Sequence, residues 1–144
     1  MKTSQSNLIE SELKRFVEKK MAELTLGVEA RLKSAPPEGG TPVDTGWARA
    51  NWIPNIGVPV RIESERPSDA GEISSGISSR TSAAESNGLQ IAASFRIEQG
   101  PLFVSNNVPY IGLLNDGSSA QAPAAFVQRA IRTEIQAVTN KAGK

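Results

Sequence analysis

The clearest chemical signature lies in the stretch TPVDTGWARANW, which contains the tripeptide Asp44-Thr45-Gly46. An Asp-Thr-Gly turn carries the catalytic carboxylate of aspartic proteases, in which two such aspartates share one proton. The nearest second copy, Asp116-Gly117-Ser118, has glycine where the motif requires threonine. The first copy follows GGTPV rather than an apolar strand, and the bulky Trp47 comes directly after it. These departures favour a structural turn, with a carboxylate-dependent, aspartic-protease-like hydrolase as the alternative.

Other catalytic residue types are sparse in this chain of 144 residues. It contains no histidine and no cysteine, which removes Ser-His and Cys-His nucleophile pairs and every thiolate metal site. The sequence has no phosphate-binding P-loop, no G-x-G-x-x-G fingerprint and no carboxylates at metal-ligand spacing. We therefore predict a protein that is not an enzyme and that needs no cofactor and no metal.

The charge balance limits the partners of the chain. The net charge is +1, and the basic residues are not interleaved with aromatic ones, which argues against sequence-specific DNA binding. No apolar run approaches the roughly 20 residues that span a bilayer. The N-terminal MKTSQSNLIESELKRF also lacks the apolar stretch of a signal peptide. We expect no association with a membrane.

The opening stretch is physically reasonable as a capped turn followed by packing residues. The Asp44 carboxylate can accept hydrogen bonds from the following amides, and Gly46 permits a tight backbone conformation. The asparagines and the proline before Tyr110 also indicate a turn. The expected turn residues are Asp44, Thr45, Gly46, Asn106, Asn107, Pro109 and Gly117, and the expected packing anchors are Trp47, Trp52, Tyr110 and Phe126.

Two long helices are expected to position these turns. Residues 1–34 predict an N-terminal helix, with a capping box of Asn7 and Glu10 near its start. Its apolar face recurs at spacings of three and four residues and consists of Ile9, Leu13, Phe16, Val17, Leu24 and Val28. Pro123 is expected to open a C-terminal helix over residues 123–139, because the first turn needs no amide donor. The apolar stripe of that helix is Phe126, Val127, Ala130, Ile131, Ile135 and Val138.

The signals between the two helices are weaker. Prolines interrupt the β-like stretch IPNIGVPVRIESERP, which predicts short or edge strands at best. Residues 64–81 are rich in serine and glycine and predict a flexible loop. Residues 82–97 alternate like a strand, but they also carry a capping box and a helical apolar face, and their alanine content leads us to choose helix. Residues 102–104 predict a short strand, and residues 110–115 predict a second strand or extended segment.

These elements together predict a fold of the α+β class in one domain over residues 1–144. The long N-terminal and C-terminal helices are expected to pack on a small, mainly antiparallel β-sheet with long loops. A chain of this length can bury a core without help from a disulfide or a metal.

The ordered set of motifs resembles the tail-completion and head–tail joining proteins of long-tailed bacteriophages, in particular the lambdoid protein Z-like branch. That family has a Val-Asp-Thr-Gly turn, an Arg, an Asn-Trp pair, an Asn-Asn-x-Pro-Tyr turn, an acidic-Gly-x-Ser loop, and Gln-Ala-Pro before a helix. Here these motifs are Val43–Gly46, Arg49, Asn51-Trp52, Asn106–Tyr110, Asp116–Ser118 and Gln121–Pro123. The likeness covers about residues 41–135 and the N-terminal helix. It departs where Asp116 replaces the usual Glu, and where Ala124 and Ala125 follow the Pro.

The resemblance implies a non-enzymatic virion protein, assembled in the bacterial cytoplasm and located in the phage neck or at the head-proximal end of the tail. It implies a homo-oligomeric ring, hexameric by resemblance. The ring would bind the tail tube or tail terminator protein on one side and head connector or adaptor proteins on the other, with DNA passing through its lumen. A host-interaction accessory protein is a further alternative. The candidate assembly contacts are Arg49, Asn51, Asp116, Ser118 and Gln121, of which we expect Arg49 or Asn51 to be the surface residues that matter for assembly.

Overall fold

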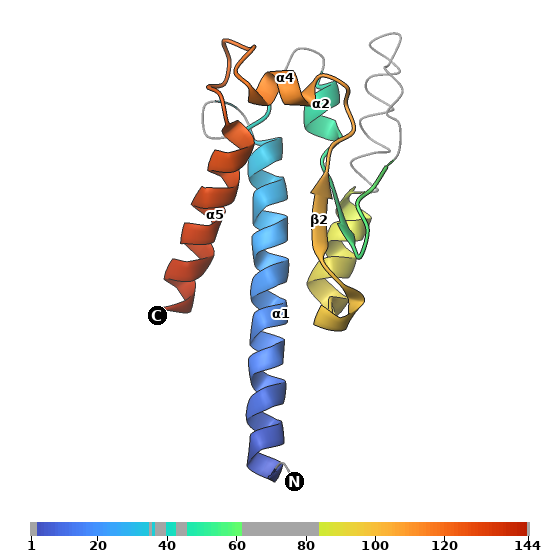
Figure 1. Cartoon of the computed structure of the whole chain (residues 1–144), viewed down its shortest axis with the longest axis vertical. Coiled ribbons are helices and arrows are strands. Elements are labelled where there is room, and N and C mark those ends of the chain that lie inside the picture. The colour runs from blue at the N-terminus through green and yellow to red at the C-terminus, as the bar shows by residue number, and fades with distance from the viewer. Residues whose placement is uncertain (1–2, 35, 37–39, 43–45, 62–83, 144) are drawn as a thin grey trace.

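The long helix α1 (Ser4–Lys33) is the axis of the molecule (Figure 1). The computed structural model describes residues 3–34, 36, 40–42, 46–61 and 84–143. In Figure 1, α5 (Phe126–Ala142) lies on one side of α1, and a strand pair with the helix over residues 84–94 lies on the other. The short helices α2 (Trp47–Ala50) and α4 (Ile111–Asn115) lie at the end of the molecule where α1 ends. The α+β class is confirmed, whereas the predicted loop over 64–81 lies outside the described residues.

Helix α1 begins earlier than the predicted capping box. Thr3 is its N-cap, and the Thr3 hydroxyl accepts a hydrogen bond from the Ser6 amide at 3.3 Å. Asn7 therefore lies within the first turns, and the prediction that Asn7 and Glu10 cap the helix is wrong. Arg31 in the last turn is favourably placed against the partial negative charge of the C-terminal carbonyls.

The apolar face of α1 is covered only in its C-terminal half. Val28 is buried, and Leu24 packs against the same core cluster. Ile9, Leu13 and Phe16 are instead 66%, 60% and 49% exposed. Figure 1 shows the reason, because α1 extends beyond α5 and beyond the strand pair at its N-terminal end. The helical spacing was predicted correctly, but the first half of the face has no core to enter.

The sheet consists of β1 (Ile53–Ile56) and β2 (Leu102–Ser105), paired antiparallel with Ile53 opposite Ser105 and Ile56 opposite Leu102. Pro54 is tolerated because a two-stranded sheet consists of edge strands, where a missing amide donor need not break a ladder. The predicted short strand over 102–104 and the predicted short edge strand after Trp52 are both confirmed.

The ambiguous segment after residue 82 is helical over residues 84–94, which confirms the choice of helix there. Ile91 and Phe95 are buried against Ala22 of α1. Leu89, which belongs to the strand-like alternation, is 72% exposed. The spacing of four residues between Ile91 and Phe95 therefore decided the structure, because it places both side chains on the face toward α1.

Two predictions at the C-terminal side are wrong. Residues 110–115 were expected to be extended, but Ile111–Asn115 forms α4, because Ile111 and Leu114 at a spacing of three residues both reach buried clusters. Pro123 was expected to open the last helix, but α5 begins at Phe126. Ala125, directly before it, has the left-handed backbone with φ 62°. The start of α5 is capped across the loop by Asn115, whose Oδ1 accepts from the Val127 amide at 3.0 Å.

The main core cluster joins both long helices to the segment before the sheet. Its buried members are Val28, Leu32, Trp52, Phe126 and Ala130. Phe126 is fully buried, so α5 is anchored through its first turn. Further along α5, Ile131 and Ile135 of the predicted stripe are 39% and 46% exposed. The stripe is thus buried near α4 and open to solvent toward the C-terminal end of α5.

Gly27 of α1 lies against the Glu134 side chain of α5, and this contact allows a direct test of how the two helices pack. A Cβ atom at position 27 would overlap the side chain of Glu134, whose carboxylate pairs with Arg31 Nε at 2.6 Å. Alanine is about 1 kcal/mol better than glycine inside a helix. In the Glu134→Ala background we expect Gly27→Ala to raise the free energy of unfolding by about that amount. In the native background we expect no net gain, because the new methyl group displaces the ion pair.

Urea unfolding of the native chain, both single variants and the double variant measures this coupling. An equal effect of Gly27→Ala in both backgrounds would show that the Glu134 side chain does not contact position 27.

Candidate functional site

The residues of the two central motifs come together at the end of the molecule formed by α2 and α4. The Trp47 ring meets the Tyr110 ring edge-on, with 5.4 Å between centroids and 62° between planes. Trp47, Ala48 and Val108 are buried together, with Tyr110, Ile111 and Leu114 packed against them. Gly46 has φ 79°, the left-handed conformation that glycine adopts without steric cost. Two segments more than fifty residues apart in the sequence thus form one packed unit.

The asparagines of the second motif hold this unit through backbone groups. The Asn106 amide nitrogen donates to the Ala48 carbonyl at 2.8 Å, and its oxygen accepts from the Val108 amide at 3.1 Å. Asn107 donates to the Val60 carbonyl at 2.7 Å. Each side chain replaces a regular backbone partner in a tight turn, which is a usual role of asparagine. Both asparagines are therefore engaged within the fold.

Asn51 does not lie on the surface, contrary to expectation. It is 5% exposed, and its side-chain amide donates to the Trp47 carbonyl at 2.6 Å. This bond satisfies the carbonyl of the first residue of the single helical turn α2, which has too few residues to satisfy its own carbonyls. The physical reason for the error is that a short helix before a strand needs such a polar cap. An Asn next to a buried Trp is a signal of that cap.

Thr41 is the contact that sequence reasoning missed. It is fully buried, and its hydroxyl donates to the Leu32 carbonyl at 2.7 Å. The same hydroxyl accepts from Trp52 Nε1 at 2.7 Å, and the Thr41 amide donates to the Leu32 carbonyl at 3.0 Å. One hydroxyl thereby joins the end of α1 to the indole in the main core. The available signal was the indole itself, because a buried Trp N–H needs an acceptor.

Arg49 has a buried side-chain nitrogen for which the described residues supply no acceptor. It is half-buried, and its Nε is inaccessible to solvent and has no hydrogen-bond partner among the described residues. A buried guanidinium nitrogen without an acceptor is costly, because it has lost water without gaining a protein partner. Arg49 therefore stays a candidate assembly contact, as the sequence predicted.

The other candidate contacts lie on the loop between α4 and α5. Asp116, Ser118 and Gln121 are exposed, and the backbone amide of Gln121 donates to Ser119 Oγ at 3.2 Å. Gly117 has φ 95°, and a Cβ atom there would approach Ala124 to 3.0 Å. Asp44 and Thr45 lie outside the described residues, so their role in the turn stays a prediction.

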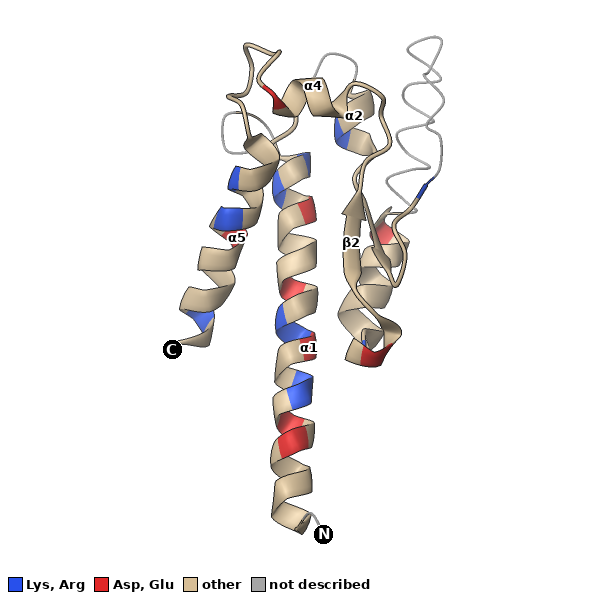
Figure 2. Cartoon of the chain, viewed as in Figure 1, with Lys and Arg blue, Asp and Glu red and all other residues tan. Residues whose placement is uncertain are grey.

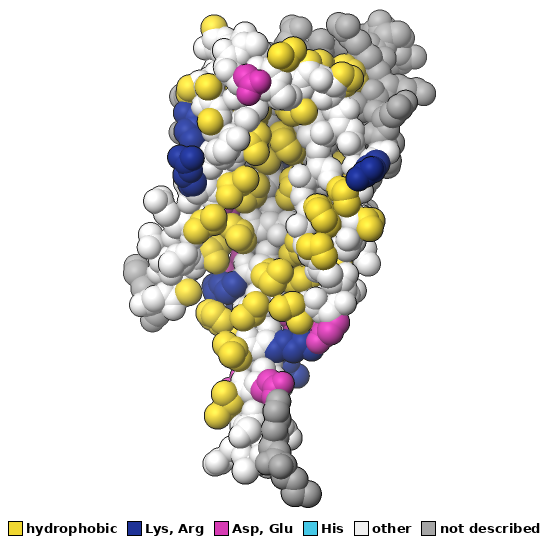
Figure 3. All heavy atoms as spheres, viewed as in Figure 1, with side chains coloured by type: hydrophobic (Ala, Val, Ile, Leu, Met, Phe, Trp, Pro, Cys, Tyr) yellow, Lys and Arg dark blue, Asp and Glu magenta, His cyan; other side chains and the backbone are white. Residues whose placement is uncertain are grey.

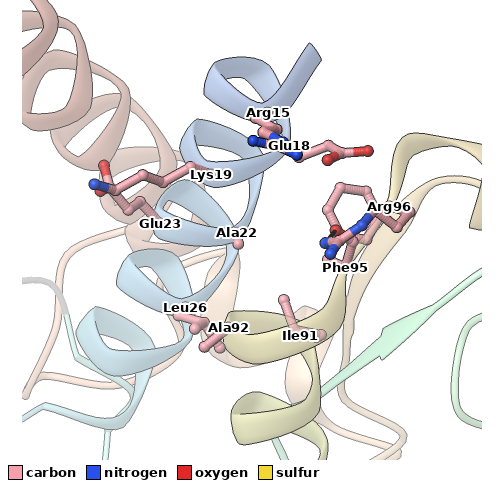
Figure 4. Close-up of a pocket in the computed structure, with 10 residues that line it drawn as sticks. All are labelled: Arg15, Glu18, Lys19, Ala22, Glu23, Leu26, Ile91, Ala92, Phe95 and Arg96. Carbon is pink, nitrogen blue, oxygen red and sulfur yellow. Dashed lines mark hydrogen bonds between the residues drawn. The ribbon is translucent and has the colours of Figure 1, made fainter. Parts of the chain in front are cut away.

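A groove lies between α1 and the helix over 84–94 (Figure 4). Its volume is about 440 Å³, with Ala22, Leu26 and Ile91 in its apolar wall. Its charged groups make internal contacts. Glu18 accepts from the Ile97 amide at 3.0 Å, and the hydrogen bond from Lys20 to Glu23 at 2.8 Å lowers the pKa of the Glu23 carboxyl. A carboxyl with a lowered pKa is a poor general acid at neutral pH.

Among the described residues there is no group of carboxylates that could hold a metal ion. The same residues include no helix long and apolar enough to cross a membrane. Comparison with known proteins finds no matching family model, no matching curated protein and no matching solved structure. The region around Trp47 and Tyr110 is thus described by its geometry alone. It is a packed structural unit with exposed polar residues on the loop beside it.

The Thr41 hydroxyl gives a sharp stability test. Thr41→Val keeps the shape but leaves the Trp52 N–H buried without an acceptor, so we expect a loss of about 2–3 kcal/mol in the free energy of unfolding. Thr41→Ser retains the hydroxyl and is the matched control, with a smaller loss from the missing methyl group. Urea unfolding followed by tryptophan fluorescence measures both. Equal losses for the two variants would contradict the bridging role.

Proposed function

We propose that this chain is a structural virion protein that forms a ring at the head-proximal end of a phage tail or in the neck. In this role it completes the tail and joins it to the head connector. One face of the ring binds the tail tube or tail terminator protein, and the other binds connector or adaptor proteins. DNA passes through the lumen without sequence-specific contacts, and no catalytic step is involved.

The observation that carries the proposal is the exposed N-terminal half of α1. Its side chains Ile9, Leu13 and Phe16 are between 49% and 66% exposed on one helix face. A contiguous apolar face of this kind on a soluble domain marks a surface that binds another macromolecule. An assembly protein requires such a surface.

The arrangement of the two ends supports a joining role. Arg49 on α2 and the exposed loop after α4 lie at one end of the molecule, and the N-terminal end of α1 lies at the other (Figure 1). A protein that connects two different partners needs two separate surfaces. The 30 residues of α1 separate these surfaces by about 45 Å at 1.5 Å per residue.

The packing of the motifs also supports the resemblance on which the proposal rests. The motif around Trp47 and the motif around Tyr110 contact each other directly. The two motifs thus form one packed unit, which is compatible with the resemblance.

Arg49→Ala is expected to leave the fold intact and to impair assembly. The variant should unfold within about 1 kcal/mol of the native chain, because none of the ion pairs among the described residues involves Arg49. Phage particles that carry it should show tails without heads, or heads without tails, in electron micrographs. The matched control is Arg15→Ala, which removes the same charge from an exposed site on α1. Normal particle yields with Arg49→Ala would count against Arg49 as an assembly contact.

The proposal as a whole is tested by the position of the protein in a reconstruction of the phage particle. Density for this chain in the neck or at the head-proximal tail end is expected. Its absence from mature particles, together with normal tails after deletion of its gene, would refute the proposal. The hydrolase alternative makes a different prediction: Asp44→Asn should abolish a measurable peptidase activity without changing the unfolding transition.

A further inference from the structure

Two apolar strips remain largely exposed on the described surface of one copy. The arm strip is Ile9, Leu13 and Phe16 on α1, at spacings of four and three residues. The flank strip is Ile131 and Ile135 on α5, 39% and 46% exposed. Figure 3 shows hydrophobic side chains continuing along α1 below the body of the molecule. Large apolar side chains at helical spacing form a continuous strip that a second helix can cover.

The arm strip lies on the side of α1 that packs against α5 further along the helix. Gly27 and Arg31, which contact Glu134 of α5, follow Ile9, Leu13 and Phe16 at helical spacings on the same face. Leu13 precedes Gly27 by 14 residues, which is about 21 Å along the axis. The α5 helix of the same chain therefore does not reach the arm strip. The face of α1 that contacts α5 therefore continues past the end of α5. Within one copy, α5 covers only the C-terminal half of this face.

The first residues of α1 and the helix α5 carry opposite charges. Residues 3–13 contain Glu10 and Glu12 and no Lys or Arg, whereas Lys14, which pairs with Glu98, and Arg15 follow directly beside Phe16. Helix α5 carries Arg129, Arg132 and Lys141, and its single acid, Glu134, already pairs with Arg31. Figure 2 shows blue residues along α5 and red residues near the N-terminal end of α1. The opposite charges at the N-terminal end of α1 and on α5 favour an encounter between these two helices.

We propose that the arm strip of one copy packs on the flank strip of the next copy, so that α1 of one subunit binds α5 of its neighbour. The inference rests on the proposed ring and identifies the surface that would build it. The contact uses two different patches, which makes it a head-to-tail contact, and such contacts generate rings when the rotation closes. Pairing two arms with each other would leave Ile131 and Ile135 in water.

Disulfide trapping tests the contact directly, because the chain has no cysteine of its own. The variants Leu13→Cys/Ile131→Cys and Leu13→Cys/Ile135→Cys are oxidised mildly and run on a non-reducing gel. We expect a ladder at multiples of the monomer mass from at least one of them. A bridge within one copy is excluded, because a disulfide needs Cα atoms within about 7 Å. Leu13 lies about 21 Å along α1 from Gly27, which contacts Glu134 of α5. The matched control is Leu13→Cys/Leu89→Cys, whose second site is also an exposed leucine, and it should give no ladder.

The single variants identify the competing geometry. Leu13→Cys alone should stay monomeric, and a covalent dimer from it would mean that two arms pair with each other, which would overturn the proposal. No ladder from either double variant would overturn it as well. These outcomes are separate from the proposed function, because the position of the protein in the particle does not depend on which strip forms the contact.

A mixing experiment gives a second readout without cysteines. Leu13→Glu disables the arm strip, and Ile135→Glu disables the flank strip, and each site is exposed enough for the fold to tolerate the charge. We expect each variant alone to sediment as a monomer. Their mixture should form a one-to-one dimer of twice the mass, because one variant keeps the arm strip and the other keeps the flank strip. A mixture that stays monomeric while the native chain oligomerises would contradict a head-to-tail contact.

Discussion

The structure depends on the hydroxyl of Thr41, which links the last turn of α1 to the indole of Trp52. Thr41 is fully buried and satisfies a carbonyl at the end of α1 and a buried N–H in the core at the same time. Because the bond fixes Trp52, it also fixes the start of β1 one residue later and the position of α2 before it. The partner strand β2 leads directly into the turn that packs Tyr110 against Trp47. The hydrogen-bonded threonine therefore holds the motif end of the molecule on α1 together with the core cluster around Trp52.

The two halves of α1 are stabilised in different ways. The C-terminal half is held by Val28, Leu32 and the core cluster around Phe126. The N-terminal half has no such core, and it remains helical because adding a residue to an existing helix costs far less than nucleating a new one. A half that is helical but uncovered is pre-ordered for binding, since little conformational entropy remains to be lost on association. This difference connects the fold to the proposed assembly role.

Much of the local structure could be predicted because it depends on neighbours in the sequence. The spacing of Ile91 and Phe95 predicted a helix, and the run Leu102–Val104 predicted a strand, and both were confirmed. The errors arose where a distant partner decided the outcome. Asn115 caps α5 across a loop, so the helix starts at Phe126 and not at Pro123. Asn51 is buried because α2 needs a cap, a demand that appears only once the strand after it is placed.

By itself, the sequence determined the fold class, the periodic faces of the long helices and the absence of histidine and cysteine from any mechanism. These features follow from residue types and spacings of two, three or four, which act over one or two turns of chain. Only the tertiary structure decided which part of each face is buried. The stripe of α1 looks uniform from Ile9 to Val28, yet only its second half meets α5, because α5 is too short to cover the first. The exposed remainder is a property of helix lengths and their relative placement, which no local pattern encodes.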